Sequence, residues 1–410
     1  MTVLTLAIAS DIHADTADNR WTRVTCEPPQ ARRKQHPLTD LAVLIAEKEL
    51  RADYLVVPGD IANQANDTGL AYGWRRLNEI ASLLEAKLIG VPGNHDVVTR
   101  SRTPHRHAML RNLLPSFPTG VSTYDDHFWD NGWCLIEKET HRLLLLDSTL
   151  GFPEYPDIDD EESEEWKQYL IALDRGSITE QVEQALEDVL SGLTESKLNI
   201  AVVHHHPQEH QNRQYMQDQY GPMVRGGELL QLFSQYPRVG RWMVIHGHKH
   251  IPQLVNAVTT TSNGPLVLCA ASLGAKLWEP INTITRNQFH VLTVTDTFVS
   301  GTDSLRGTVE SYMWGYGNGW DVSERKGSGL PGVGGFGCAE DFRTISRRIT
   351  TVMESENGEF IEYDDLVSRV PQLPYMLPTD LEFLEDELEQ NGYSFRRDRR
   401  QRLTQLVRRV

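Results

Sequence analysis

Short apolar runs recur along the first three quarters of the chain, and each run predicts a buried strand. They cover residues 3–9, 54–57, 88–91, 133–137, 142–147, 198–203, 242–246, 265–270, 289–295 and 307–314. Apolar positions with helical spacing lie between several of these runs and predict helices. The helices cover residues 39–50, 68–85, 179–191 and 226–235. This alternation of strands and helices predicts parallel crossovers and therefore an α/β fold.

Polar side chains follow five of the predicted strands, directly after the point where each strand ends. They are Asp11 and His13, Asp60, Asn94 with His95 and Asp96, His204 with His205 and His206, and His248 with His250. In an open α/β sheet, ligands bind at the carboxyl ends of the strands, and those ends lie along one edge. We therefore expect residues far apart in the chain to converge on one site.

The residue types at these strand ends are those that bind metals. Carboxylates, an amide oxygen and imidazoles together suit Mn²⁺, Fe²⁺ or Zn²⁺. The candidate ligands are too numerous for one ion, so two divalent ions sharing a carboxylate are expected, with Asp60 from a central strand as the bridge. Two ions about 3.5–4 Å apart clamp a phosphorus centre for in-line displacement and generate a hydroxide nucleophile at neutral pH.

The motifs, taken in chain order, resemble those of the calcineurin-like metallophosphoesterase superfamily over roughly residues 1–320. The pattern of that superfamily is DxH, GD, GNH(D/E), H and GHxH. In this chain it is met by Asp11/His13, Gly59/Asp60, Gly93–Asp96, His204 and Gly247–His250. The spacing is more similar to the cyclic-nucleotide phosphodiesterase branch than to the protein Ser/Thr phosphatases. The resemblance implies a four-layer α/β/β/α sandwich.

The resemblance also implies a role for each position. The first metal would be held by Asp11, His13, Asp60 and His250, and the second by Asp60, Asn94, His204 and His248. Asn94 and His95 would contact the phosphoryl group, and His95 would protonate the leaving oxygen as general acid. An imidazole suits that role because its pKa lies near neutrality. Asp96 would orient neighbouring groups.

Two departures from the pattern leave assignments open. Many members carry GDxxD, whose second Asp orients the catalytic histidine, whereas this chain has Asn63 there. Asn63 can still accept a hydrogen bond but contributes no charge. In the triple histidine, His204 is the predicted ligand because it comes first after the strand, and His205 is the alternative. His206 and His246 are predicted to be structural.

Composition and charge limit the classes of partner and the cellular compartment that we expect for this protein. The chain of 410 residues is 39% hydrophobic and 24% charged, which is typical of a globular protein. A net charge of −17 argues against a general binder of nucleic acid or anionic membrane. The four cysteines are widely separated, and no apolar stretch approaches the ~20 residues of a membrane span. We expect a cytoplasmic protein that does not enter a membrane.

The chain divides into three predicted parts: a metallophosphoesterase domain at 1–324, a Gly-rich linker or loop at 325–338, and a helical accessory segment at 339–410. Amphipathic helices in the last part usually dock on their own domain, on another copy or on a partner protein. Seven arginines lie between 396 and 409. We interpret that tail as a helix balanced by neighbouring Asp and Glu, in preference to a contact with nucleic acid.

The predicted function is hydrolysis of a small phosphodiester, such as a cyclic nucleotide. The alternative is a nuclease of the same superfamily that holds DNA or RNA with residues 339–410; a phosphomonoesterase or a non-enzymatic scaffold is less favoured. The basic stretches 20–34 and 100–111 either hold phosphate oxygens or form a solvated surface. Four aromatic residues are predicted to be core residues in preference to base-stacking ones: Tyr72, Trp74, Trp129 and Trp133.

Overall fold

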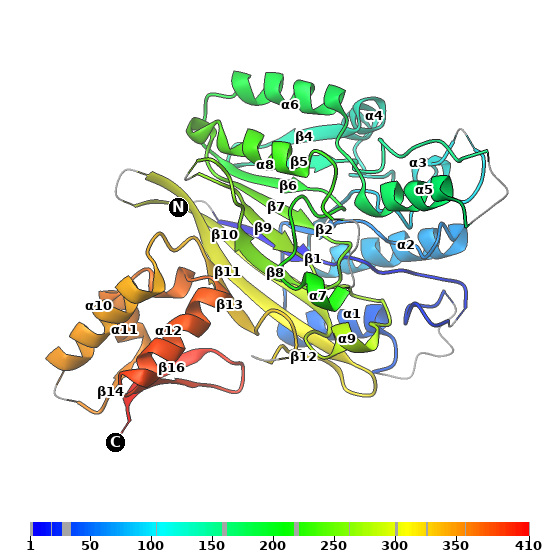
Figure 1. The fold of residues 1–410 in the computed structure, drawn as a ribbon. Helices are drawn as coiled ribbons and strands as arrows, with labels where there is room; N and C mark the ends of the chain where they lie inside the picture. Colours follow the sequence, from blue (N-terminus) through cyan, green and yellow to red (C-terminus); the bar gives the residue numbers. More distant parts are fainter. Residues whose placement is uncertain are drawn as a thin grey trace.

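Two β-sheets lie face to face in the middle of the larger, N-terminal part of the molecule, with helices on their outer faces (Figure 1). The computed structural model describes residues 3–17, 19–26, 34–103, 105–157, 162–216, 221–261, 263–299, 302–324, 327–356 and 358–409. The layers confirm the predicted α/β class. No helix within those residues is long and apolar enough to cross a membrane.

The first sheet has the strand order β12-β11-β10-β1-β2-β3, and β13 also pairs with β11. Its strands are β1 (Val3–Ile8), β2 (Tyr54–Val57), β3 (Lys87–Gly90), β10 (Asn287–Val299), β11 (Thr302–Gly315), β12 (Gly319–Val322) and β13 (Val333–Phe336). Strands β1, β2 and β3 are parallel, and β10 runs antiparallel to β1. The connecting helices are α1 (Pro37–Lys48) and α2 (Asp67–Leu83). The first three strands therefore end at the same edge.

The second sheet has the order β4-β5-β6-β7-β9-β8, with β5, β6, β7 and β9 parallel. Its strands are β4 (Trp133–Glu137), β5 (His141–Leu146), β6 (Leu198–Val202), β7 (Trp242–His246), β8 (Gln253–Asn256) and β9 (Leu266–Cys269). Helices α6 (Glu180–Gly192) and α8 (Gly226–Ser234) pack on its outer face (Figure 1). The remaining elements of this part are α3 (Ala108–Arg111), α4 (Ser122–Asn131), α5 (Glu164–Arg175), α7 (Arg213–Met216), η1 (Pro237–Val239) and α9 (Glu279–Asn282).

Three of the four aromatic residues considered for base stacking are buried packing residues. Tyr72, Trp74 and Trp133 are buried. Trp129 packs against the core that contains Tyr72 and Trp74, and its indole N–H donates to the carbonyl of Phe117. The prediction of core positions is confirmed for Tyr72, Trp74 and Trp133, whose burial stabilises the fold as that of large apolar groups does, whereas Trp129 is partly buried at the edge of a core.

The C-terminal part folds around a hydrophobic core of its own. Its elements are α10 (Phe342–Ser355), β14 (Phe360–Glu362), α11 (Tyr363–Arg369), η2 (Leu373–Tyr375), α12 (Pro378–Gln390), β15 (Tyr393–Arg397) and β16 (Leu403–Arg408). Ile345, Ile349, Leu384 and Leu388 are all buried there, as their helical spacing predicts. Three α-helices followed by a two-stranded hairpin form the winged helix-turn-helix arrangement.

Two predictions for this part are wrong. The arginine-rich tail is not a helix but the hairpin of β15 and β16, although its charges are balanced as expected: Arg397 pairs with Glu385 and Arg409 with Glu389. The Gly-rich segment 325–338 is not all linker, because Val333–Phe336 pairs antiparallel with β11. Pairing of strands uses backbone groups, which glycine also supplies. Residues 325–326 of that segment lie outside the described residues.

Candidate metal centre

Five of the predicted ligand residues have the left-handed backbone conformation. Their φ angles are 52° for Asp11, 51° for His13, 53° for Asp60, 74° for His248 and 59° for His250. For a residue with a Cβ this conformation costs of order 1 kcal/mol or more, and such residues cluster at functional sites. The backbone turns sharply where each strand ends, which places these side chains together at the sheet edge.

Two glycines of the motifs provide the space for this convergence. A Cβ on Gly59, whose φ is +88°, would lie 2.5 Å from Nδ1 of His204. A Cβ on Gly93 would lie 2.2 Å from Oδ1 of Asp60. Both distances are shorter than real Cβ contacts, so any side chain here would displace a predicted ligand. The Gly in GD and in GNH is therefore required by packing at the site.

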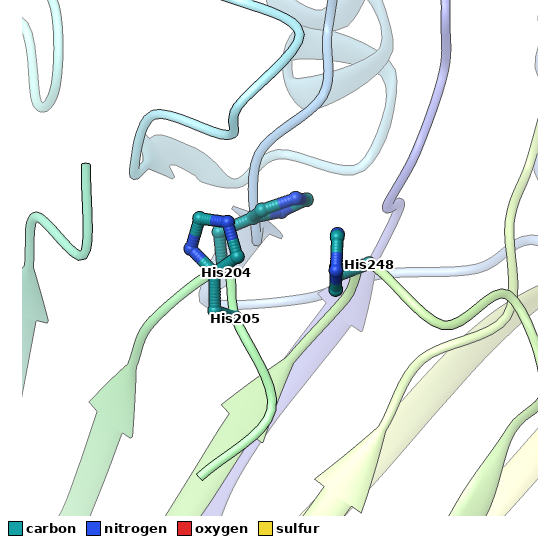
Figure 2. Close-up of side chains that lie close together, drawn as sticks. All are labelled: His204, His205 and His248. Carbon is teal, nitrogen blue, oxygen red and sulfur yellow. The ribbon is translucent and has the colours of Figure 1, made fainter. Parts of the chain in front are cut away.

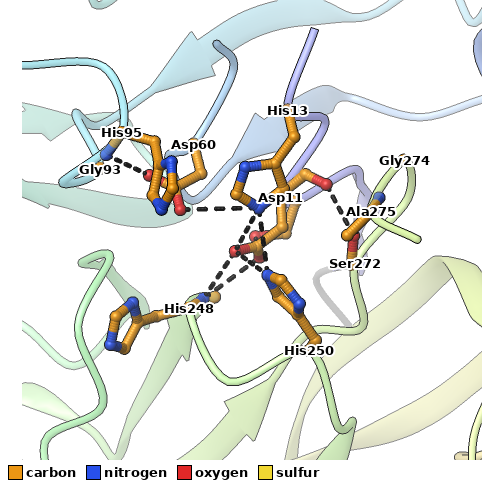
Figure 3. Close-up of polar contacts among 12 residues, drawn as sticks. Asp11, His13, Asp60, Gly93, His95, His248, His250, Ser272, Gly274 and Ala275 are labelled. Carbon is orange, nitrogen blue, oxygen red and sulfur yellow. Dashed lines mark hydrogen bonds and ion pairs between the residues drawn. The ribbon is translucent and has the colours of Figure 1, made fainter. Parts of the chain in front are cut away.

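Asp11, His13 and His250 form the first cluster of possible metal ligands (Figure 3). Nε2 of His13 lies 3.1 Å from Nε2 of His250, which in turn lies 3.3 Å from Oδ1 of Asp11. The backbone N–H of His248 donates to the Asp11 carboxylate over 3.0 Å. The strand end after β1 and the GHKH turn after β7 are thereby joined, although 237 positions separate the two residues.

Asp60, Asn94 and His204 meet at the second cluster. Nε2 of His204 lies 3.1 Å from Oδ1 of Asn94 and 3.4 Å from Oδ2 of Asp60. The same Asp60 oxygen lies 3.7 Å from Nε2 of His13 in the first cluster. Asp60 is thus placed between the two clusters, as a bridging ligand must be, and the bridging role stays a prediction.

His248 is the fourth histidine at this centre, beside His204 and His205 (Figure 2). Its Nε2 is buried and has no hydrogen-bond partner among the described residues; the nearest carboxylate oxygen, Oδ1 of Asp174, is 3.5 Å away. Burying an imidazole nitrogen without a partner is costly. Buried carboxylates, an amide oxygen and imidazole nitrogens facing one another fit divalent ions, so the donor set suits two of them.

His205 is held by groups that are not metal ligands. Its Nδ1 lies 2.7 Å from Oγ of Ser148, and its Nε2 lies 3.2 Å from the carbonyl oxygen of Leu173. Both nitrogens are therefore engaged, whereas Nε2 of His204 faces Asp60 and Asn94. This arrangement favours His204 as the ligand. His246 is buried and bonded to the Gly247 carbonyl, as predicted.

The charge states of the site suit metal binding. Burial raises the pKa of Asp60, but His204 and His95 outweigh it and hold the pKa well below its usual range. Burial lowers the pKa of His13 to about 3, so its ring is neutral. Burial also lowers the pKa of His204, yet the carboxylates of Asp60 and Asp11 raise it to about 9. A metal at His204 would therefore displace a proton.

The hydrogen bonds around His95 differ from those expected. The Asn63 side-chain amide donates to Asp15 over 2.7 Å and has no contact with the His95 ring among the described residues. The backbone N–H of Gln64 donates instead to Nδ1 of His95 over 3.2 Å. The role of Asn63, which the sequence leaves open, is not one of contacting His95 in this structure, because its side-chain amide is directed to Asp15. With Nδ1 as acceptor, the neutral ring carries its hydrogen on Nε2.

Asp96 is buried behind the site, and its side-chain hydrogen bonds within the described residues come from backbone N–H groups. Its Oδ1 accepts from the N–H of Ala62 over 2.7 Å, and its Oδ2 accepts from the N–H of Gly93 over 3.0 Å. Burial, followed by the charge of Asp60, raises the pKa of Asp96 to about 7. Asp96 thereby fixes the loop after β2 to the loop after β3, and its orienting role stays a prediction.

A cavity of about 470 Å³ opens beside Asn94 and His95. Its lining residues are Gln64, Ala65, Asn94, His95, Val98, Thr99, Arg100, Ser101, Leu170, Leu173 and Asp174. Arg100 comes from the basic stretch 100–111, so that stretch does reach the rim. In the stretch 20–34, residues 27–33 lie outside the described residues. The wall formed by α5 was not predicted, because no strand-end motif marks it.

The sequence matches the Calcineurin-like phosphoesterase family over residues 4–252. The chain therefore belongs to this family, whose members are metal-dependent phosphoesterases that use a dinuclear metal centre. Residues 334–390 match a second family, described as wHTH-Calcineurin_assc, which agrees with the winged helix-turn-helix arrangement of the C-terminal part. A comparison with curated proteins returned no match.

The comparison with solved structures returned several similar chains. Purple acid phosphatase PPD1 from yellow lupin is 16% identical over 78% of this chain and 52% of its own, with a TM-score of 0.46. A 5'-nucleotidase precursor from Thermus thermophilus is 12% identical over 76% and 55%, with a TM-score of 0.38. Phosphopantetheinyl hydrolase from Mycobacterium tuberculosis is 16% identical over 66% and 90%, with a TM-score of 0.34. This chain spans about half the length of the first two.

Proposed function

We propose that the chain is a dinuclear metal-dependent phosphodiesterase that hydrolyses a small phosphodiester. The observation that carries the proposal is the position of Asp60 between two ligand clusters, with His95 beside them. Asp11, His13, Asp60 and His250 would hold one ion, and Asp60, Asn94, His204 and His248 the other. Mn²⁺, Fe²⁺ or Zn²⁺ suits this mixture of oxygen and nitrogen ligands. Such ions, when bound, polarise phosphoryl oxygens and lower the pKa of an attacking water.

The residues of the chain supply orientation and a proton donor. Asn94 and His95 contact the phosphoryl group from the loop that Asp96 fixes in place. To act as general acid, His95 must carry a proton on both ring nitrogens; it then gives the Nε2 proton to the leaving oxygen and becomes a neutral ring. The hydrogen bond from the Gln64 N–H to Nδ1 belongs to the neutral form and is released while the ring is charged. In the overall reaction, the oxygen of water forms a new bond to phosphorus and the bond to the leaving oxygen breaks. The leaving oxygen gains a proton as general acid catalysis requires.

The cavity beside His95 favours a diester over a monoester. A volume of about 470 Å³ leaves room for a second ester arm next to the phosphoryl position. Among the described residues that line it there is no Phe, Tyr or Trp, so apart from the imidazole of His95 no ring is present to stack a nucleobase. A cyclic nucleotide is therefore a less suitable substrate than the sequence alone indicates.

The charges on the C-terminal part disfavour the nuclease alternative. In a winged helix-turn-helix, the second helix of the pair is the one that enters the major groove, and here that helix is α12. It carries no Lys or Arg, and its acidic residues are Asp380, Glu382, Glu385, Asp386, Glu387 and Glu389. Such a helix would be repelled by phosphates. Several arginines of the hairpin are already paired with carboxylates of the chain.

The test compares bis-p-nitrophenyl phosphate with p-nitrophenyl phosphate, using protein with Mn²⁺ and the same protein with chelator. We expect turnover of the diester that requires Mn²⁺ and exceeds turnover of the monoester. Preferential hydrolysis of the monoester would replace the proposal by a phosphomonoesterase. Absence of hydrolysis of both esters by protein with two bound ions would contradict an enzymatic role toward simple phosphoesters.

A further inference from the structure

The cavity beside His95 is bounded by two segments that contain none of the predicted metal ligands. Residues 98–101 follow the GNHD motif and form one wall. Leu170, Leu173 and Asp174 of α5 form the other. The cavity therefore continues from the predicted phosphoryl-binding position into a space whose residues belong to no ligand motif.

Helix α5 is tied to the metal centre at several points, so this wall has a defined position. The Tyr169 hydroxyl donates to the carbonyl of Thr99 over 2.6 Å, which joins the two walls. The Leu173 carbonyl is bonded to His205, directly after β6. Asp174 lies 3.3 Å from Nζ of Lys249, inside the GHKH turn. A pocket with walls held in this way is preorganised for binding.

The inner surface of the pocket is partly aliphatic. Leu170 keeps 37% of its surface exposed although it lines a concave site, and Leu173 and Val98 lie on the same cavity. An exposed leucine elsewhere would need no explanation, but here it faces the space next to His95. When a ligand covers apolar groups that are exposed in a pocket, the removal of their surface from water makes the free energy of binding more favourable.

One cation on the rim is available for an anion. Arg100 is exposed and makes no ion pair with any described carboxylate, whereas Arg102, two residues on, pairs with Asp157. The acid of the opposite wall, Asp174, is instead next to Lys249. An unpaired guanidinium can bind a carboxylate or phosphate with two hydrogen bonds.

We propose that this pocket selects a phosphoester whose second arm is an aliphatic chain with an anionic end. The chain contacts Val98, Leu170 and Leu173, and its anionic end lies at Arg100. The proposal rests on the proposed function, because it assumes that the phosphoryl group binds at Asn94 and His95. It adds the substrate class, and it assigns Leu170 and Arg100 to specificity.

Binding of three phosphonates separates the contributions of the chain and of the charge. We would titrate the Mn²⁺-loaded protein by calorimetry with methylphosphonate, hexylphosphonate and 6-phosphonohexanoate. The last two have chains of equal length, and they differ in the terminal carboxylate. We expect hexylphosphonate to bind about 10-fold more tightly than methylphosphonate, and 6-phosphonohexanoate to bind about 3-fold more tightly again.

Variants assign these preferences to residues. In Leu170→Ala, the ratio of Kd values for methylphosphonate and hexylphosphonate should fall about 3-fold or more. In Arg100→Ala, the preference for the carboxylate should disappear. Two exposed residues of α2 outside the cavity give matched controls, Leu83→Ala and Arg75→Ala, and both should keep the wild-type ratios.

The proposal and the proposed function fail in different ways. Equal affinity for the three phosphonates, or ratios unchanged by both variants, would overturn the aliphatic and anionic assignment even if the diester is hydrolysed. Tighter binding of adenosine 5'-phosphate than of hexylphosphonate, by 10-fold or more, would also overturn it. Absence of hydrolysis with the expected order of binding would instead contradict the proposed function alone.

Discussion

His204 donates from Nδ1 to the carbonyl oxygen of Pro58 over 2.7 Å, and this bond joins the ends of strands from two different sheets. A carbonyl oxygen only accepts, so the hydrogen of the neutral ring is on Nδ1 and the lone pair is on Nε2. In histidines that bind metals, a hydrogen bond from the ring nitrogen that does not bind the metal fixes the tautomer in this way. The Pro58 carbonyl therefore prepares His204 as a ligand.

The first prediction concerns metal content. His204→Ala should lose about one of two bound Mn²⁺ ions per chain, because Nε2 is then absent beside Asp60 and Asn94. His205→Ala should keep both ions and lose mainly stability, because its nitrogens bond Ser148 and Leu173. Elemental analysis after gel filtration, together with thermal unfolding, measures the two effects. If His205→Ala alone loses an ion, the assignment between these histidines is reversed.

The second prediction concerns Asp60. Asp60→Ala should lower metal-dependent hydrolysis of the diester by about 10³-fold or more, because both ions would lose a shared ligand. The chelated variant should still unfold cooperatively, as judged by circular dichroism. Asp321→Asn, an exposed acid on β12, is the matched control and should keep full activity. Full activity in Asp60→Ala would show that no ion depends on this carboxylate.

The third prediction concerns His95. His95→Ala should bind two metal ions normally and turn over about 10²–10⁴-fold more slowly. The loss should be greatest for diesters with poor leaving groups, because those develop the most charge on the leaving oxygen that Nε2 contacts. Rates for a series of aryl esters with leaving groups of increasing pKa measure this dependence. An equal loss across the series would mean that His95 contacts another phosphoryl oxygen.

The fourth prediction concerns pH and His290, a buried residue of β10 that is distant from the ligand motifs in the chain. Burial lowers the pKa of His290 to about 3, from about 6.5 in the unfolded chain. Between these values the unfolded chain binds a proton and the folded chain does not, so stability falls as the pH decreases. The contribution of His290 is fully present above pH 6.5.

His290→Gln removes this titration. The free energy of unfolding of the chelated variant should therefore fall less steeply from pH 6 to pH 4, by about 1.4 kcal/mol per pH unit. Urea unfolding at several pH values measures the slope for both proteins. Equal slopes would show that His290 is protonated in the folded protein or that another group compensates.

The sequence alone predicted the centre of the molecule well, since the signals there are local. Each strand is a compact apolar run, and each ligand follows its strand within a few residues, as Asp60 follows Val57. Parallel pairing then brings these ends together. The cavity wall was not predicted because α5 is placed by distant contacts, such as that between Tyr169 and Thr99. The contact between Gln64 and His95 uses a backbone N–H, which the identity of the side chain does not indicate.

The errors in the C-terminal part have a related cause. Charge balance for the arginines was anticipated, but charges do not distinguish a helix from a hairpin, and Arg397 reaches Glu385 from β15. The glycine composition of β13 predicted a linker, whereas its backbone completes the pairing of β11. Both elements are determined by their partners more than by their own residues.

The pairing of β13 with β11 has a mechanical consequence for the C-terminal part. Hydrogen-bonded strands run without interruption from β13 through β11 and β10 to β1, and β1 leads directly into Asp11. Arg402, in the turn between β15 and β16, adds an ion pair to Glu310 of β11. The winged helix-turn-helix is therefore joined to the first sheet by strand pairing and by an ion pair, and not by a flexible linker alone. A displacement of it would therefore act on the sheet whose strand ends carry Asp11, His13, Asp60 and Asn94, four of the predicted ligands.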